Sequence, residues 1–508
     1  MLQELEELRT AAVELLQELA RIELARATGG PLPTKLPVLA RKHRLATSGD
    51  GLAQACEELV NSSDVDGEGT RPGRVARLSS LRDFLLRARA LGLEPGAAQE
   101  LVELDRRPSV RPPGDAGLHG ALPVVQVERT LPLLRDRQRR GELERALAEA
   151  VGEADGLRSA VFDAAQTALG ELRLGDPARA AAALHRRGWS EEDPAAAAEK
   201  LLRDTDAIAG DLGRWLLERH AGVDRGAERH DLLYLVHAPP CASAFPRGEL
   251  LRTCRRWAEM LRLDLDAQRA VRLDDDDAPL RPAGAHAVAV DPPDEIRVVL
   301  ATQEGPRALA QLLSALSVAQ LRAGPPGDAP PEDLWLGDPG LPFACGAVLA
   351  SLVREPEWLR RCARTDLRRD DERAIAYAFV LDARLAAART LGSLEAHVTG
   401  FGARAGQAMR DLYLRATGTD LPAGLALREL DPFLSSWAEL RGLALASFIR
   451  SRLREKFDED FWRNPRALLP LQGMWGRGGR PSVADFFAEL GAAASIDPLA
   501  ADLVEACR

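Results

Sequence analysis

Strand-like sequence occurs convincingly in only one part of this chain, residues 268–302. There the runs AVRL, HAVAV and EIRVVL alternate or run apolar between proline and glycine residues, as short β-strands do. The next segment, 306–323 (PRALAQLLSALSVAQLRA), repeats leucine at helical spacing and has small residues in its middle. Helical patterns dominate elsewhere, so we expect a mainly α-helical protein with one small sheet directly before a largely apolar helix.

The pattern of residues along the sequence changes near residue 226. A chain of 508 residues is long enough for two cores or for one large two-lobed body. We assign residues 1–225 to an N-terminal helical lobe, and residues 226–508 to a second lobe that holds the small sheet, the helix 306–323 and further C-terminal helices. In the first lobe, Ser190 precedes a helical run to about residue 220 and is predicted to cap that helix.

Composition and charge exclude several classes of function. The 67 basic and 77 acidic residues give a net charge of −10, without the basic stripe of a nucleic-acid binder. The six cysteines form no CxxC or other close pair, which argues against a zinc finger or a small disulfide framework. No run of about 18 apolar residues occurs, and the charged N-terminus does not resemble a signal peptide. We therefore expect a cytoplasmic protein without nucleic-acid or membrane partners.

Short motifs that carry chemistry are scarce. The sequence has no GxxxxGK[ST], no strand-linked GxGxxG, no GxSxG and no HExxH. The acidic run 274–277 (DDDD) lacks the ligand spacing and the glycine of a calcium loop, so we predict a solvated turn between two strands. His230 and His237 could share a helix face, but no third ligand stands at a suitable spacing. We interpret them as surface or core histidines.

The order of several segments resembles a known family. After the β region come LGDPGLPF, then EPEWL, and much later DPFLSSWAELR and FDEDFWRNP. This order resembles bacterial metallopeptidases of the oligoendopeptidase F and thimet oligopeptidase type, which are gluzincins. DPFLSSWAELR is similar to the family's Asp-Pro-x-Phe-Tyr-x-x-x-Tyr-Leu-Arg, and FDEDFWRNP to its Glu-x-Trp-Trp-x-x-Pro. The resemblance covers nearly the whole chain and implies a zincin-like, two-lobed helical clamshell around a deep cleft.

The resemblance also implies where a catalytic site would stand. Such peptidases hold Zn²⁺ with two histidines four positions apart on one helix and a glutamate from a following helix, and a glutamate beside the first histidine acts as general base. Aligning TQEG with the turn that ends the family's strand places Ser314 at the first histidine and Val318 at the second. The same register places Ala315 at the general base and Phe343 at the third ligand.

The residues at these positions cannot reproduce that site. Valine and phenylalanine have no lone pair to donate, and a serine hydroxyl alone is a poor ligand. Ala315 supplies no carboxylate to deprotonate water. We therefore expect no zinc and no other cofactor.

A rival register places Gln303, Glu304 and Arg307 on the zinc motif. It keeps a glutamate at the general-base position, but it breaks the spacing between strand and helix. It also puts Pro306 inside the zinc helix, where proline costs about 3 kcal/mol. We therefore prefer the first register.

The residues that stabilise the transition state in the family are also replaced. The resemblance places its Tyr or His at Ser435 and a second aromatic hydroxyl at Glu439, while Arg441 persists and could equally be structural. Our candidates for binding in the cleft are Ser314, Ser435, Glu439 and Arg441.

Three functions are compatible with this pattern. We favour an inactive metallopeptidase homologue that binds a peptide or protein partner in the cleft, or that serves as a scaffold or pseudo-subunit of an active paralogue or a homodimer. A metal-free enzyme could instead reuse the cleft through Glu439 and Arg441, although residues two apart do not share a helix face. An active zinc oligopeptidase would need ligands elsewhere in the chain.

Overall fold

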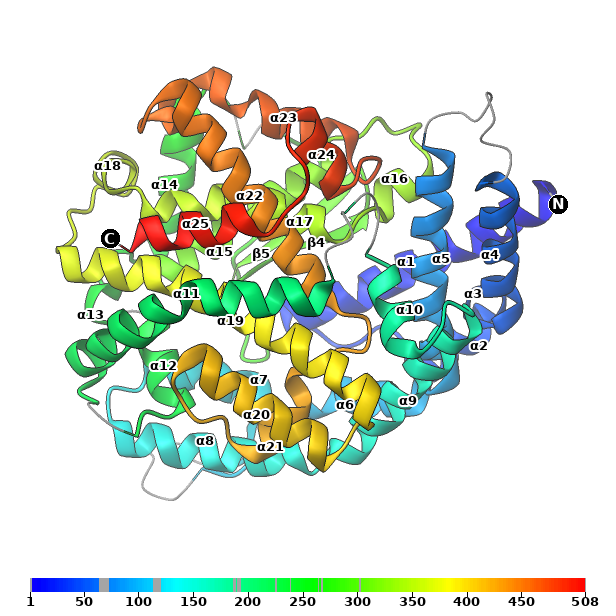
Figure 1. The fold of residues 1–508 in the computed structure, drawn as a ribbon, viewed down its shortest axis with the longest axis horizontal. Coiled ribbons are helices and arrows are strands. Elements are labelled where there is room, and N and C mark those ends of the chain that lie inside the picture. Colours follow the sequence, from blue (N-terminus) through cyan, green and yellow to red (C-terminus); the bar gives the residue numbers. More distant parts are fainter. Residues whose placement is uncertain are drawn as a thin grey trace.

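Helices form most of the described chain, as the sequence predicts, and the strands belong to small sheets (Figure 1). The structure is a computed structural model of the 508-residue chain. It describes residues 2–63, 73–112, 120–185, 189, 193–223, 226–237, 239–263, 265, 268–300 and 303–507. None of the described helices is long and apolar enough to cross a bilayer.

The first part of the chain is a series of helices with one short antiparallel strand pair, β1 and β2. Its elements are α1 (Leu2–Thr28), α2 (Leu36–Lys42), α3 (Arg44–Thr47), α4 (Gly49–Ser63), α5 (Arg74–Leu93), α6 (Pro95–Leu104), β1 (Pro108–Val110), β2 (Leu122–Pro123), α7 (Val124–Thr130), α8 (Arg137–Gly152), α9 (Asp155–Glu171), α10 (Pro177–Ala183) and α11 (Pro194–Leu216). Asp193 caps α11 and accepts a hydrogen bond from the backbone N of Ala195 (3.4 Å), whereas Ser190, the predicted cap, lies outside the described residues.

The second part contains the central sheet and the helices that surround it. Its elements are α12 (Arg229–Val236), α13 (Pro239–Ala242), α14 (Arg247–Met260), β3 (Val271–Asp274), β4 (Ala285–Asp291), β5 (Glu295–Leu300), α15 (Pro306–Ala323), α16 (Pro331–Trp335), α17 (Gly340–Ala350), α18 (Pro356–Trp358), α19 (Arg369–Thr399), α20 (Ala403–Thr417), α21 (Ala423–Ala426), α22 (Ser435–Phe457), α23 (Leu469–Arg477), α24 (Val483–Glu489) and α25 (Asp497–Ala506).

The central sheet has three strands in the order β3-β5-β4. β3 runs parallel to β5, and β4 runs antiparallel to it. All three strands lie within the range 268–302 in which the sequence predicts a sheet. Ile296 and Val298 of β5 are fully buried, α15 packs against β4 and β5, and α1 packs against β4. The acidic run follows β3 as an exposed turn before β4, and Arg281 donates to Oδ1 of Asp274 (2.7 Å).

The helix α15 begins directly behind this sheet. Gly305 has a φ of 104°, a left-handed value that glycine tolerates, and Pro306 takes the first helical position, where its missing N–H is not needed. Gln303 and Glu304 therefore lie before the helix. The rival register fails, because its first ligand would stand outside the helix whose single face must carry both ligands.

Small residues in the middle of α15 bring it close to α17. Ser317 is fully buried, and its Oγ donates to the carbonyl O of Cys345 in α17 (2.7 Å). The same oxygen accepts a hydrogen bond from Nε1 of Trp475 (3.3 Å). A Cβ added at Gly346 would lie 2.2 Å from Oγ of Ser314, so the two helices approach each other as closely as these side chains allow.

One hydrophobic core runs through both predicted lobes. Buried residues from Leu5 in α1 to Cys507 at the C-terminus belong to one connected cluster. α11 and α19 lie side by side across the middle of the molecule, and α22 contacts α17, α19 and α25 (Figure 1). The division into lobes at residue 225 therefore stays a prediction from the sequence.

Candidate functional site

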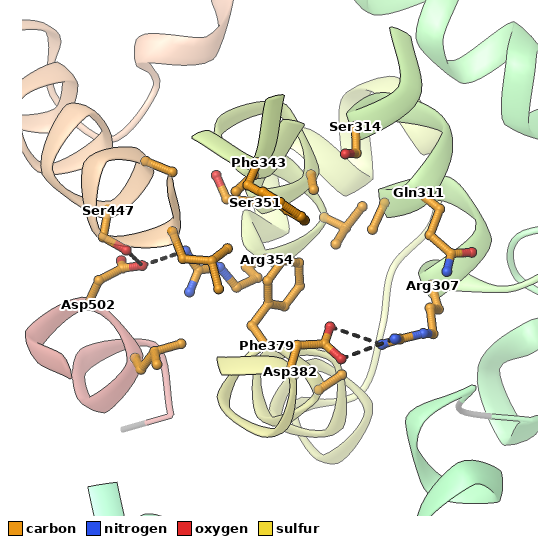
Figure 2. A pocket seen from close by; sticks show the side chains of 18 of the residues that line it. Arg307, Gln311, Ser314, Phe343, Ser351, Arg354, Phe379, Asp382, Ser447 and Asp502 are labelled. Carbon is orange, nitrogen blue, oxygen red and sulfur yellow. Dashed lines mark hydrogen bonds and ion pairs between the residues drawn. The ribbon is translucent and has the colours of Figure 1, made fainter. Parts of the chain in front are cut away.

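A cavity of about 460 Å³ lies among α15, α17, α19, α22 and α25 (Figure 2). These helices meet there because each turns part of an apolar face to the others, and α17 carries no charged residue at all. The lining is largely apolar, with Phe379, Ile375, Leu443 and Leu503 among its residues. The cavity therefore has the size and character of a ligand site.

Three of the residues placed on zinc-ligand positions converge on this cavity. Ser314 and Val318, one helical turn apart on α15, both line it, as does Phe343 of α17. Phe343 keeps 39% of its surface exposed, which is unusual for a phenylalanine so close to the core. Ala315 is buried and does not reach the cavity, since it points behind the lining face of α15.

These residues do not fit a zinc ion. The hydroxyl of Ser314 is the one oxygen that the three positions offer, and Val318 and Phe343 have no donor atom. Ser314 is also confined by the backbone of α17 at Gly346. No catalytic step through a metal is therefore derived for this cavity.

A different group of possible ligands converges elsewhere in the described chain. Glu144, Glu228 and His230 bring ligand atoms within 4.8 Å of one another. Arg229 already donates to Oε1 of Glu144 (2.9 Å), and Nε2 of His230 lies 2.8 Å from Oε2 of Glu228. Burial opposes the charged ring, but the surrounding carboxylates, Asp231 first, raise the pKa of His230 above its ordinary value. We interpret this group as an ion-pair cluster.

His237 does not join that cluster. Its Nδ1 lies 2.8 Å from the carbonyl O of Leu233, one turn earlier in the same helix. Burial, and next the charge of Arg307, lower the pKa of His237 to about 4. His230 and His237 therefore lie in different surroundings and do not form a shared metal site.

Glu439 lies where the large cavity meets a smaller one. The second cavity has a volume of about 220 Å³ and is lined by Ser435, Ser436 and Glu429, among others. Glu439 and Phe343 line both cavities. The two candidates Ser435 and Glu439 thus lie one turn apart on α22, and only Glu439 reaches the large cavity.

The carboxyl group of Glu439 has unusual electrostatics. No hydrogen bond or ion pair joins it to any other described residue. Burial, together with the nearby negative charge of Asp382, raises its pKa to about 7, although Arg389 and Arg307 act in the opposite direction. A carboxyl with such a pKa can gain or lose a proton, or bind a cation, near neutral pH.

Arg441 lies away from both cavities, which corrects our assignment of this residue to the cleft. It is fully buried and donates from Nη1 and Nη2 to the two carboxylate oxygens of Asp338 (3.1 and 2.8 Å). Its Nη2 also lies 3.4 Å from Nδ1 of His185, whose pKa is lowered to about 3 by burial and by the charge of Arg441. Arg441 therefore fastens α22 to the loop before α17, and it cannot pair with Glu439.

Two groups of ion pairs in the lining were not predicted from the sequence. Arg307 of α15 donates to both oxygens of Asp382 in α19 (3.0 and 3.1 Å). On the other side, Asp502 of α25 accepts from Arg354 (2.8 Å) and Ser447 (3.2 Å). Figure 2 shows these groups at opposite sides of the cavity with Phe379 between them. The partners stand 75 and 148 residues apart in the sequence, and no local pattern links them.

The fold is similar to that of solved peptidases. A Bacillus anthracis protein assigned as an oligoendopeptidase F has 10% sequence identity and a TM-score of 0.63, covering 92% of this chain and 84% of its own. A PZ peptidase A solved with an inhibitor has 11% identity and a TM-score of 0.66, covering 92% and 86%. The M32 carboxypeptidase of Deinococcus radiodurans has 14% identity and a TM-score of 0.53, covering 99% of both chains. No protein-family model and no curated protein sequence matches this chain.

The chain therefore has the mainly helical fold of gluzincin peptidases of the oligoendopeptidase F and M32 carboxypeptidase types. This agrees with the family that the order of the sequence motifs resembles. At such low identity the likeness establishes the architecture, and the function must be argued from the cavity itself.

Proposed function

We propose that this protein is a catalytically inactive metallopeptidase homologue that binds an apolar segment of a peptide or protein partner in its central cavity. The observation that carries the proposal is the convergence of Ser314, Val318 and Phe343 on one cavity. The register that assigns them to zinc-ligand positions comes from the sequence, and their positions on neighbouring helices support it.

The chemistry of the lining supports binding rather than zinc-dependent hydrolysis. A zinc peptidase needs nitrogen or oxygen donors for the metal and a general base beside the metal-bound water. The lining offers too few donors for such a metal site, because the carboxylates of Asp382 and Asp502 are engaged by arginines and only Glu439 remains without a partner among the described residues. The open volume and apolar walls remain, and burying apolar groups there yields about 25 cal/mol per Å².

The test measures metal content, hydrolysis and binding on the full-length protein. We expect no stoichiometric zinc by elemental analysis and no chelator-sensitive cleavage of a mixed fluorogenic peptide library. We expect apolar peptides to bind without being cleaved. One tightly held Zn²⁺ per chain together with chelator-sensitive cleavage would overturn the proposal.

A cavity-filling variant locates the binding. Ala347→Phe places a ring in the large cavity, since Ala347 lines it, and should abolish peptide binding. Ala53→Phe is the matched control, because Ala53 lies on the exposed face of α4. Equal loss of binding in both variants would show that the cavity is not the binding site.

A metal-free enzyme remains the second candidate function. The carboxyl of Glu439, with a pKa of about 7, has the acidity that general acid–base catalysis uses at neutral pH. Arg441 cannot assist it, since it is buried beside Asp338. Turnover of a compound in an untargeted metabolite screen, lost in Glu439→Gln, would establish this alternative.

A scaffold or pseudo-subunit role makes a separate prediction. It requires a stable complex with a second copy of the chain or with an active paralogue. Light scattering of the purified protein, alone and mixed with such a paralogue, distinguishes this role from binding of a peptide in the cavity.

A further inference from the structure

We propose that the central cavity selects an apolar ligand that carries an ammonium group, and that the carboxylate of Glu439 binds this group. The inference rests on the proposed function, since it names the ligand class of the same cavity. It covers two sources of the same chemistry, a small apolar amine and the free amino terminus of an apolar peptide.

The first argument is the balance of charge around the two cavities. Apart from Glu439, every charged side chain that lines them has a partner among the described residues. The pairs are Arg307 with Asp382, Arg354 with Asp502, Arg450 with Glu355, and Arg389 with Glu429, while Asp431 accepts from the backbone N of Phe433 and Ser435. Glu439 is therefore the one carboxylate in the lining that has no direct hydrogen-bond or ion-pair partner among the described residues. The ammonium group of a ligand would supply that partner.

The second argument is the position of Glu439. It lies at the junction of the two cavities together with Phe343. Phe343 packs against α22 at Gly442, one turn beyond Glu439, because a Cβ added at Gly442 would lie 2.7 Å from Cβ of Phe343. An ammonium group bound there has a carboxylate on one side and an aromatic ring close by, and aromatic faces attract cations.

The third argument is the character of the remaining walls. Val318, Ile375, Phe379, Leu443 and Leu503 surround the large cavity with apolar surface. The rest of the ligand must therefore be apolar. A volume of about 460 Å³ accommodates one or two large apolar groups, not an extended polar peptide.

A ligand carboxylate fits this cavity poorly. The guanidinium groups of Arg307 and Arg354 already contact Asp382 and Asp502, so an anion would have to displace a carboxylate that the protein supplies. The guanidinium carbon of Arg354 lies 4.9 Å from the ring centre of Phe379, and its Nε and Nη1 have no hydrogen-bond partner among the described residues but are buried, so they do not face the open cavity. Glu439 itself would repel an anion whenever it is ionised.

The test compares octylamine, octanol and octanoate, which share one apolar chain and differ in the head group. Isothermal titration calorimetry on the full-length protein at pH 8 should show octylamine binding at least about tenfold more tightly than octanol, because a carboxylate–ammonium contact in a water-poor cavity replaces a neutral hydrogen bond. Octanoate should bind most weakly. Glu439→Gln should remove the preference for the amine and leave octanol binding unchanged.

The control variant is Glu455→Gln, which removes a carboxylate from the exposed side of the same helix. It should change none of the three affinities. If octylamine and octanol bind equally to the parent protein, and Ala347→Phe abolishes both, the ammonium inference is overturned while cavity binding stands. If none of the three probes binds, the cavity is not a ligand site and the inference also fails.

A peptide pair separates the two sources of the ammonium group. The tripeptide amide Phe-Leu-Leu-NH₂, which has no carboxylate, should be compared with its N-acetylated form in the same measurement. Tighter binding of the free peptide supports the inference and identifies a peptide amino terminus as the source. Binding of octylamine without discrimination between the two peptides also supports it and identifies a small amine.

Discussion

Glu439 and Arg441 stand two residues apart on α22 and have opposite surroundings. Glu439 faces the cavity and has no partner among the described residues, whereas Arg441 is fully buried behind it and engages both oxygens of Asp338. The wall of the cavity thus carries a carboxylate without a direct partner, while the guanidinium behind the wall is held by a carboxylate. The difference indicates that one face of α22 is open to a ligand while the other face holds the fold together.

The largest effect is expected when zinc-ligand side chains are introduced into the wall of the cavity. The combined variant Ser314→His, Val318→His and Phe343→Glu should bind one Zn²⁺ per chain, where the parent is expected to bind none, because it introduces three ligands that face the same cavity. Elemental analysis after gel filtration measures this. The same variant with leucine instead of histidine at position 318 has two ligands and should not retain zinc. Failure of the full variant would show that our register is wrong.

Among the substitutions that alter stability, the largest loss is expected when the ion pair behind the wall, Arg441 with Asp338, is removed. Arg441→Met leaves the buried carboxylate of Asp338 without its guanidinium partner, and breaking such a pair costs roughly 3–5 kcal/mol. Urea unfolding at pH 7.5 measures the loss. Arg452→Met on the exposed face of α22 is the control and should cost less than about 1 kcal/mol. Similar losses in both variants would contradict the structural role of Arg441.

Removing the charge of Glu439 from the cavity wall should increase the stability of the protein, whereas removing the charge of Arg441 should decrease it. The pKa of Glu439 is about 7 in the folded protein against an ordinary 4.5, so the folded state loses stability as the pH rises from 4.5 to 7 and stays destabilised above. The groups that face this carboxyl are Arg389, Asp382 and Arg307. Glu439→Gln should therefore stabilise the protein at pH 8 by on the order of 2 kcal/mol more than at pH 5.

Urea unfolding of both proteins at the two pH values measures this difference. The control is Glu455→Gln, whose carboxylate is exposed and should show no such pH dependence. An equal effect of Glu439→Gln at pH 5 and pH 8 would mean that the carboxyl is well solvated, and the case for an unsatisfied charge in the cavity would be lost.

The sequence predicted those parts of the molecule that local patterns determine. Alternating apolar runs located the sheet, leucine spacing located α15, and the order of motifs indicated the fold. Ser314, Val318 and Phe343 line one cavity even though Phe343 belongs to another helix, while their assignment to zinc-ligand positions stays a prediction. These successes depend on residues that are close in sequence or fixed by the known order of a family's elements.

The pairs across the cavity could not be predicted. Arg307 and Asp382 lie on different helices, while Arg354 ends the short 3-10 turn after α17 and Asp502 lies on α25. In the sequence each of these charges looks like part of an ordinary solvated surface. Only the packing of α15, α19 and α25 brings them together. The orientation of Arg441 was partly foreseeable, since residues two apart on a helix point in different directions.

The smallest expected effect tests the closeness of α15 and α17 beside the cavity. Gly346→Ala should change stability by less than about 1 kcal/mol, because the added methyl group overlaps with Oγ of Ser314, which can rotate away, and lies 3.3 Å from Cβ of Ser314, while alanine favours the helix by a similar amount. In a double-mutant cycle with Ser314→Ala, the two substitutions should couple favourably by about 0.5–1 kcal/mol, since alanine at 314 removes the obstructing oxygen.

Gly473→Ala is the matched reference for this cycle, because a Cβ at that helical glycine meets nothing within 4 Å. It should stabilise the protein by alanine's helix preference alone, about 1 kcal/mol, and should not couple to Ser314→Ala. A loss of several kcal/mol in Gly346→Ala would mean that Ser314 is held rigidly in its present rotamer. In that case the wall of the cavity would be as tightly fixed as the contacts behind it, and the distinction between the two faces of the site would not hold.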